Sequence, residues 1–285
     1  MNHREEILSK VRSIPSLPAA AVEVARLIQD PEADFSEVAG AIGYDPGLTA
    51  NVLRVANSAY YGGSRSISSV KEAVVRLGAK RIFQMVVASS VQPLVHKPVK
   101  GYDLPPGELW EHSVAVALGT DEIASFFSLK PPDYAFTAAL VHDVGKIVLG
   151  TFVEVDAAPI MELAYKEKLS FDLAERRVLG IDHAEAGAAL LEAWNLPQRV
   201  VDVVRWHHQP ECFEGDTLLC DLVHAADQVS MVIGVGAGAD GLNYRPSSEA
   251  MDRLGFTAPA AEAVMCRIVS ALDEVRAAFS FEKRV

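Results

Sequence analysis

The chain has 285 residues and a formal net charge of −12 at pH 7. Half of its residues are hydrophobic and 22% are charged, which is typical of a globular protein and excludes a disordered or collagen-like chain. The three cysteines form no CxxC pair, so neither a disulfide framework nor a thiolate zinc site is expected. Without a leader segment or a run of ~20 apolar residues, the chain is expected to be cytoplasmic, with no membrane contact.

The charge is unevenly distributed. Residues 1–100 carry a net charge of +3, whereas residues 101–285 carry −15. An acidic protein repels the phosphate backbone, so a nucleic-acid partner is not expected. Only the first third of the chain offers a basic surface.

Short helices are predicted in the first part of the chain. Apolar residues recur at helical spacing over Leu17–Ile28, and a further helix is expected around 36–42. Asp45-Pro46 is typical of an N-cap followed by proline at the first helical position. Ser69 predicts another helix start, and Gly78 predicts the end of that helix. Residues 1–95 therefore suggest about five short helices.

A segment rich in proline and glycine, residues 98–107, separates the two parts. We therefore predict subdomains at 1–97 and 107–285. In the second part, helices are predicted at about 107–127, 133–150, 156–169, 183–194, 197–208, 216–233 and 258–280. Alternating strand patterns are scarce, so the predicted fold is all-α.

Six of the eight histidines lie in the second part. A single histidine on an apolar helix is usually a packed core residue, but His142 is followed by Asp143 within an apolar segment. A buried aspartate is costly unless a cation or strong donors accompany it. Imidazole and carboxylate ligands suit iron, manganese, zinc or nickel. Lys146, one turn after His142, would place its ammonium near an anion that reaches such a metal.

Further candidate ligands follow along the chain. Asp227 lies on an otherwise apolar helix face, and His207 shares its stripe with valines and precedes His208. His183 is expected to open a helix, and His112 lies on the apolar face of the first long helix. His224 is interpreted as a packing residue and is left out of the metal set.

The order of these residues resembles the HD superfamily of metal-dependent phosphohydrolases. The segments YDPGLTANVLRVANSAYYGG and ISSVKEAVVRLGAKRI resemble more specifically the HDOD family of bacterial signalling proteins, over residues 7–275. The resemblance implies an all-α, multi-helical fold with an HD-like C-terminal bundle. It also implies one or two divalent ions, with iron favoured, held by His112, His142, Asp143 and Asp227 at one position and by His183, His207 and His208, with Asp143 bridging, at the other.

Three functions remain open. The first is a signal-transduction protein that binds metal and acts on a partner protein in trans; the second is an active metal-dependent phosphohydrolase that uses Lys146 as a catalytic residue. The third is a metal-free scaffold with core histidines. The HD-GYP phosphodiesterases carry a glycine-rich loop after the histidine pair, where this chain reads HHQPECFEGD, so cyclic di-GMP hydrolysis is not expected.

Two further features of the sequence are weaker indications of function. Gly236, Gly238 and Gly241 match G-x-G-x-x-G, but no strand precedes them and no helix start follows, so a loop is predicted rather than a nucleotide site. A basic stretch that includes Arg65 and Arg76 adjoins Tyr60. A solvated helix face is the simplest interpretation of this stretch, and a partner-binding surface around Tyr60, Arg65 and Arg76 is the functional one.

Overall fold

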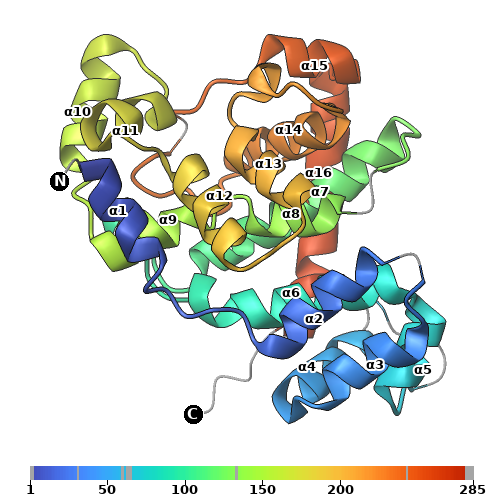
Figure 1. Cartoon of the computed structure of the whole chain (residues 1–285). Helices are drawn as coiled ribbons and strands as arrows, with labels where there is room; N and C mark the ends of the chain where they lie inside the picture. The colour runs from blue at the N-terminus through green and yellow to red at the C-terminus, as the bar shows by residue number, and fades with distance from the viewer. Residues whose placement is uncertain are drawn as a thin grey trace. The chain divides into compact units, whose positions relative to one another are not determined.

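The computed structural model describes residues 3–30, 32–58, 61, 66–131, 134–241 and 243–279 (Figure 1). Within these ranges the regular elements are helical, and an isolated bridge between Val99 and Leu104 is the one β pairing they contain. The all-α prediction is confirmed. None of the helices in the described part of the chain combines the length and the apolar character needed to cross a bilayer.

The chain divides into two compact units. The larger comprises Met1–Ser16 and Leu94–Ile268, and the smaller comprises Leu17–Pro93 and Val269–Val285. The first sixteen residues thus belong with the larger unit. The division into subdomains at 1–97 and 107–285, which the sequence indicates, stays a prediction.

The smaller unit contains the predicted short helices. They are α2 (Ala19–Ile28), α3 (Phe35–Gly43), α4 (Pro46–Ala56), α5 (Val70–Leu77) and most of α6 (Ala79–Val95). Asp45 caps α4 by accepting a hydrogen bond from the Leu48 amide at 2.9 Å. Ser69 caps α5 in the same way, and Gly78 ends it with a φ of 84°. These starts and stops are local, so the sequence predicted them correctly.

Helix α1 (His3–Val11) belongs to the larger unit and was not predicted. Ile7 and Val11 are its buried residues, and Arg4 forms an ion pair with Glu185 at 2.5 Å. Two apolar residues in a polar segment give too weak a period to identify a helix from the sequence.

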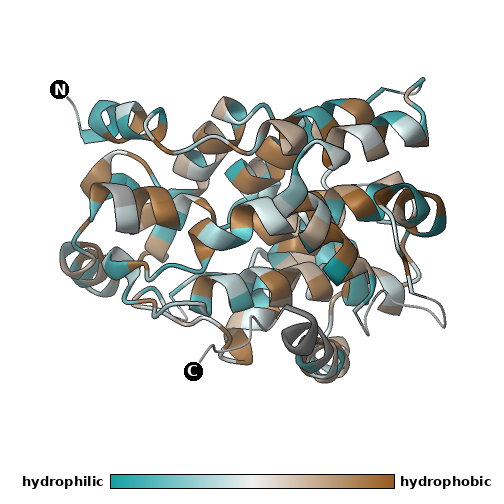
Figure 2. Cartoon of the chain, turned by 90° about the horizontal axis from the view of Figure 1, so that it is seen from below, coloured by the Kyte–Doolittle hydropathy of each residue, from teal (hydrophilic) through white to brown (hydrophobic). Residues whose placement is uncertain are grey.

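The larger unit also contains α7 (Glu108–Phe126), α8 (Ala135–Val141), α9 (Gly145–Ile147), a π-helical turn (Val148–Val153), α10 (Ala158–Glu167), α11 (Phe171–Leu179), α12 (His183–Ala193), α13 (Gln198–Trp206), α14 (Leu218–Val232), α15 (Ser248–Leu254) and the first part of α16 (Ala258–Phe279). Helices α11 and α15 were not predicted. Figure 2 shows that many helices carry apolar residues on one face and hydrophilic residues on another.

Helix α7 packs against α14 and α8 and is buried along most of its length. A Cβ on Gly119 of α7 would lie 3.1 Å from the Cβ of Ala226 on α14. The missing side chain therefore allows a close approach of the two helices. This packing determines which polar residues of α7 and α14 face each other.

The single helix predicted over 133–150 is wrong. Helix α8 ends at Val141, and residues 142–144 form a turn before α9. In this turn the Val144 amide donates to the Val141 carbonyl at 3.1 Å, and the Lys146 amide donates to the Asp143 carbonyl at 2.9 Å. These bonds span three residues rather than four and tighten the chain. The tightened turn is the part of the chain that carries His142 and Asp143.

Candidate metal centre

The turn between α8 and α9 buries His142 and Asp143 side by side. The Nδ1–H of His142 donates to the carbonyl oxygen of Ala139 at 2.7 Å, which leaves Nε2 with the ring's lone pair. Asp143 Oδ2 lies 3.5 Å from this Nε2. One nitrogen and one oxygen are thus presented to the same buried space.

Helices α7 and α14 bring His112 and Asp227 to that space. The Nδ1–H of His112 donates to the Val235 carbonyl oxygen at 2.9 Å, and Nε2 lies 3.0 Å from Asp227 Oδ1. His112 Nε2 is also 3.6 Å from Asp143 Oδ2. His112, His142, Asp143 and Asp227 form what we call the first cluster.

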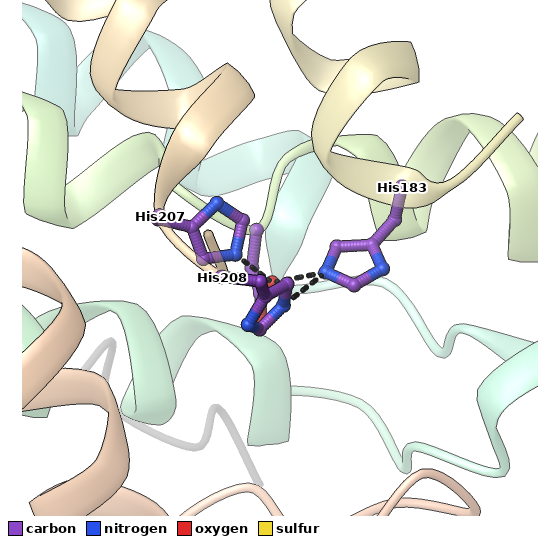
Figure 3. A group of neighbouring side chains, drawn as sticks. His183, His207 and His208 are labelled. Atoms are coloured by element: carbon purple, nitrogen blue, oxygen red, sulfur yellow. Dashed lines mark hydrogen bonds and ion pairs between the residues drawn. The ribbon is translucent and has the colours of Figure 1, made fainter. Parts of the chain in front are cut away.

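The second cluster consists of Asp143, His183, His207 and His208. His183 opens α12, and His207 and His208 follow α13 directly. The Nδ1–H of His207 donates to the Val204 carbonyl oxygen at 2.7 Å. Nε2 of His183 lies 2.8 Å from Nε2 of His208, and Figure 3 shows the three imidazole rings converging. The structure therefore brings together ring nitrogens from two helix ends.

The two oxygens of Asp143 face different clusters. Oδ2 points to His112 and His142, whereas Oδ1 lies 3.4 Å from His183 Nε2 and 3.7 Å from His207 Nε2. A carboxylate in this position can contact two ions at once. All seven residues considered as ligands from the sequence lie in these clusters: His112, His142, Asp143, His183, His207, His208 and Asp227.

Several of these buried atoms have no hydrogen-bond partner among the described residues. They include Nε2 of His142, Nε2 of His207 and Oδ2 of Asp227. Leaving such a group unsatisfied costs about 1–3 kcal/mol. Histidines that bind metal typically donate their other N–H to a carbonyl or carboxylate, as His112, His142, His183 and His207 do here. The donor set therefore fits a metal ion such as iron, manganese, nickel or zinc.

The carboxylates of the clusters are held in their charged form. Burial raises the pKa of Asp143, but Lys146 and the neighbouring His142 and His183 together bring that pKa well below its usual value. Burial likewise raises the pKa of Asp227, but the hydrogen bond from His112 and the nearby His142 ring outweigh this effect and bring that pKa well below its usual value. Both acids are therefore ionised at neutral pH, as metal ligands must be.

The histidines of the second cluster differ in pKa. Burial, reinforced by His142, lowers the pKa of His207 to about 3, so its ring is neutral. Burial also disfavours charge on His183, but the Glu175 carboxylate opposes it and raises the pKa of His183 to about 9. A metal that binds His183 must therefore displace a proton.

Lys146 is buried beside the clusters. Its Nζ lies 2.7 Å from Asp143 Oδ2 and 2.6 Å from Asp240 Oδ2. The rings of Tyr102 and Tyr244 flank the ammonium, with centroids 5.7 and 5.4 Å away. Burial lowers the pKa of Lys146, but the two carboxylates outweigh it and raise that pKa, so the side chain is charged.

Glu175 and Asp240 were not identified from the sequence. Glu175 Oε2 accepts hydrogen bonds from the His183 amide at 3.0 Å and from His183 Nδ1 at 2.6 Å, and Oε1 accepts one from the Tyr102 hydroxyl. Glu175 lies among the apolar positions of α11, and an acidic residue at such a position is the sequence signal that could have identified it. Asp240 lies in the loop that contains Gly236, Gly238 and Gly241, which we call the glycine-rich loop, and no hydrophobic periodicity could identify it there.

The structure supports a packing function for His224. Its Nδ1–H donates to the His207 carbonyl at 2.7 Å, and its Nε2 accepts from the Ser247 amide at 2.8 Å. Both nitrogens are thus engaged by the backbone.

The glycine-rich loop passes close to the site: a Cβ on Gly236 would lie 2.5 Å from the Cβ of His112, and Gly236 has a φ of 67°. The loop supports the ligands and does not begin a nucleotide-binding helix.

Comparison with known proteins assigns the chain to a family. The HDOD domain matches residues 14–210, more than two thirds of the chain. The chain belongs to the HDOD family. An HDOD domain protein from Geobacter sulfurreducens has a similar structure, with a TM-score of 0.70 and 27% identity over 96% of this chain and 97% of that one.

Two curated proteins are similar in sequence to part of this HDOD protein. An uncharacterized protein of Treponema pallidum is 25% identical over 71% of this chain and 39% of its own length. Ribonuclease Y of Thermus thermophilus is 30% identical over 61% of this chain and 25% of its own length. The chain thus spans about two fifths or less of the curated relatives it matches.

Proposed function

We propose that this HDOD protein is a metal-binding signal-transduction protein of the cytoplasm that acts through a partner protein. The observation that carries metal binding is the convergence of buried, unpaired ligand atoms from several helices on Asp143. Water could satisfy single atoms, but histidine rings held by their Nδ1 atoms and turned toward ionised acids match a metal site more closely.

The charge balance supports one or two divalent ions. Four buried carboxylates, those of Asp143, Asp227, Glu175 and Asp240, lie in or beside the clusters with the buried ammonium of Lys146, and a protonated His183 adds one further positive charge when no metal is bound. An uncompensated buried charge is strongly destabilising. Divalent cations would neutralise the excess, and the split environment of the Asp143 oxygens offers each cluster one oxygen. Among transition metals we favour iron, with manganese, nickel and zinc as alternatives, because the donors are imidazoles and carboxylates without thiolate.

Elemental analysis of protein expressed with added metal tests this proposal. Wild-type protein and a His3→Ala control, which changes an exposed histidine of α1, should both carry close to one or two transition-metal ions per chain. His142→Ala and His207→Ala should each carry less. Metal below ~0.5 per chain in the wild type would contradict metal binding.

The proposed partner surface lies in the smaller unit. Tyr60 and Arg65 lie outside the described residues, whereas Arg76 is described on α5, 3.5 Å from Glu72. Arg81 lies over the ring of Tyr61, 5.6 Å from its centroid. Arginines beside aromatic rings are common at binding hot spots, and the first third of this acidic chain is basic. The surface therefore suits an acidic protein partner.

Capture experiments from the source cell test this surface. Charge reversal at Arg65 and Arg76 should weaken capture of the partner and reduce its dependence on salt. Arg26→Glu on α2, where Arg26 pairs with Glu23, serves as the matched control on another helix of the same unit. Equal capture by both variants would contradict a partner site at Arg65 and Arg76.

A second candidate function is metal-dependent hydrolysis of a phosphoester. When bound, transition-metal ions activate water and stabilise the charge on a phosphoryl group. Asp143 and Asp227 would hold such ions, and Lys146 would balance charge on the phosphate. The similarity to ribonuclease Y, which by its name cleaves a phosphodiester, supports this candidate. Turnover of nucleotides and simple phosphomonoesters by metal-loaded protein, lost in Asp143→Ala, would establish it; no turnover would contradict it.

A further inference from the structure

Lys146 is a buried lysine beside the clusters, and it has two acidic partners. Asp143 belongs to both clusters. Asp240 comes from the glycine-rich loop, and among the described residues it pairs with Lys146 and not with a member of either cluster. Asp240 is completely buried. The ammonium of Lys146 is thus already balanced by a carboxylate that takes no part in the candidate metal centre.

The chain holds Asp240 in place. Its Oδ2 accepts a hydrogen bond from the Tyr244 hydroxyl at 2.8 Å, and its Oδ1 accepts one from the Gly241 amide at 3.2 Å. The backbone carbonyl of Asp240 accepts a bond from the Asn243 side chain at 2.7 Å. Asp240 therefore lies in a turn that orients its carboxylate toward Lys146.

Tyr244 connects this turn to the second cluster. Its ring stacks on His208 with a centroid separation of 4.3 Å and an angle of 6° between the planes. The ring of Tyr244 also flanks Lys146. Moving Asp240 away from Lys146 would therefore disturb the ring that covers His208.

We propose that Asp240 occupies the position at Lys146 that an oxyanion takes, and that it sets the site's affinity for phosphate. This inference rests on the proposed metal site, beside which the anion would bind. A phosphate oxygen that approaches Lys146 meets the Asp240 carboxylate, which repels it and already accepts from the same ammonium. Only an anion with enough charge to displace Asp240 binds. Asp240 is thus a specificity-determining residue that discriminates against weakly charged anions.

Calorimetric titration of inorganic phosphate into metal-loaded protein tests the inference. Asp240→Asn keeps the size of the side chain and removes its charge, so we expect phosphate to bind at least ~10-fold more tightly than to the wild type. The double variant Lys146→Met/Asp240→Asn should lose that gain. Unchanged phosphate affinity in Asp240→Asn would overturn the inference, as would a gain that persists without Lys146.

A matched control separates charge at this position from the general loss of a buried acid. Asp221 is also buried, and it pairs with Arg253 at 2.6 Å on the same unit. Asp221→Asn should leave phosphate affinity unchanged, and an equal gain in this variant would overturn the inference.

Two measurements keep the test decisive. Tyr244→Phe removes only the hydroxyl that donates to Asp240, so it should tighten phosphate binding by a smaller factor than Asp240→Asn. If Asp240→Asn does not fold, this variant takes its place, and an unchanged phosphate affinity in Tyr244→Phe would overturn the inference. Metal content, measured on every sample, distinguishes the two proposals. A metal-free wild type contradicts the proposed function, whereas a metal-loaded Asp240→Asn with wild-type phosphate affinity contradicts the inference alone.

Discussion

Gly145 lies in direct backbone contact with His183. A Cβ on Gly145 would overlap the His183 carbonyl oxygen and would lie 2.6 Å from the Gly187 amide nitrogen. This contact joins α9 to the first turn of α12. Because Asp143 precedes Gly145 by two residues, the absence of a side chain here brings Asp143 within reach of His183.

Gly145→Ala should therefore be strongly destabilising. The atoms that the new methyl group meets belong to the backbone, which cannot rotate away, so we expect a loss of about 3 kcal/mol in the free energy of unfolding. Gly40→Ala in α3 is the control, because a Cβ there meets nothing within 4 Å. That change should be neutral or stabilising by about 0.5–1 kcal/mol. Urea unfolding measures both, and equal stability of the two variants would contradict the contact.

Replacing Asp143 should remove more metal than replacing His183. Asp143 contacts both clusters through different oxygens, whereas His183 belongs to one. In elemental analysis, Asp143→Ala should retain little metal, and His183→Ala should retain about half of the wild-type content if two ions bind. Equal losses would indicate a single ion.

The stability of metal-free protein should decrease as the pH rises above neutrality. Burial lowers the pKa of His183, but Glu175 outweighs this effect and raises it to about 9. The folded pKa exceeds the unfolded value of about 6.5, so the bound proton stabilises the fold. This contribution is complete below about pH 6.5 and is lost as the pH rises through about 9.

Chemical denaturation of chelator-treated protein at several pH values measures this effect. In the wild type, the denaturant concentration at the unfolding midpoint should decrease as the pH is raised from 6.5 to 9. Glu175→Gln removes the charge that retains the proton, so its midpoint should vary less over the same interval. A midpoint that rises with pH in the wild type would show that His183 is neutral without metal.

Cyclic di-GMP should not be hydrolysed at an appreciable rate. Helix α13 ends at Trp206, and a short 3₁₀ turn, Pro210–Cys212, follows the histidine pair where the HD-GYP enzymes carry their loop. Residues that align a phosphate with the attacking water contribute up to ~7–11 kcal/mol to catalysis. Turnover by metal-loaded protein above about 0.1 per second, absent in Asp143→Ala, would contradict this expectation.

The sequence by itself determined the features that depend on neighbours along the chain. Asp45 and Ser69 cap their helices as predicted, because a cap is formed within a few residues. The all-α class followed from helical periodicity. The adjacent pair of His142 and Asp143 could be identified as candidate ligands, since a charged residue within an apolar segment requires a partner wherever that segment packs.

Only the tertiary structure decided how the candidate site is assembled. His112 and Asp227 lie 115 residues apart in the chain, and they meet because α7 and α14 approach closely at Gly119 and Ala226. Asp240 became recognisable only through its contact with Lys146, and the contact of Glu175 with His183 could not be read from its position on α11. Such contacts depend on the packing of distant helices and loops, which no local periodicity encodes. The residue types limit the chemistry of the site, whereas the packing of these segments determines which buried charges face each other.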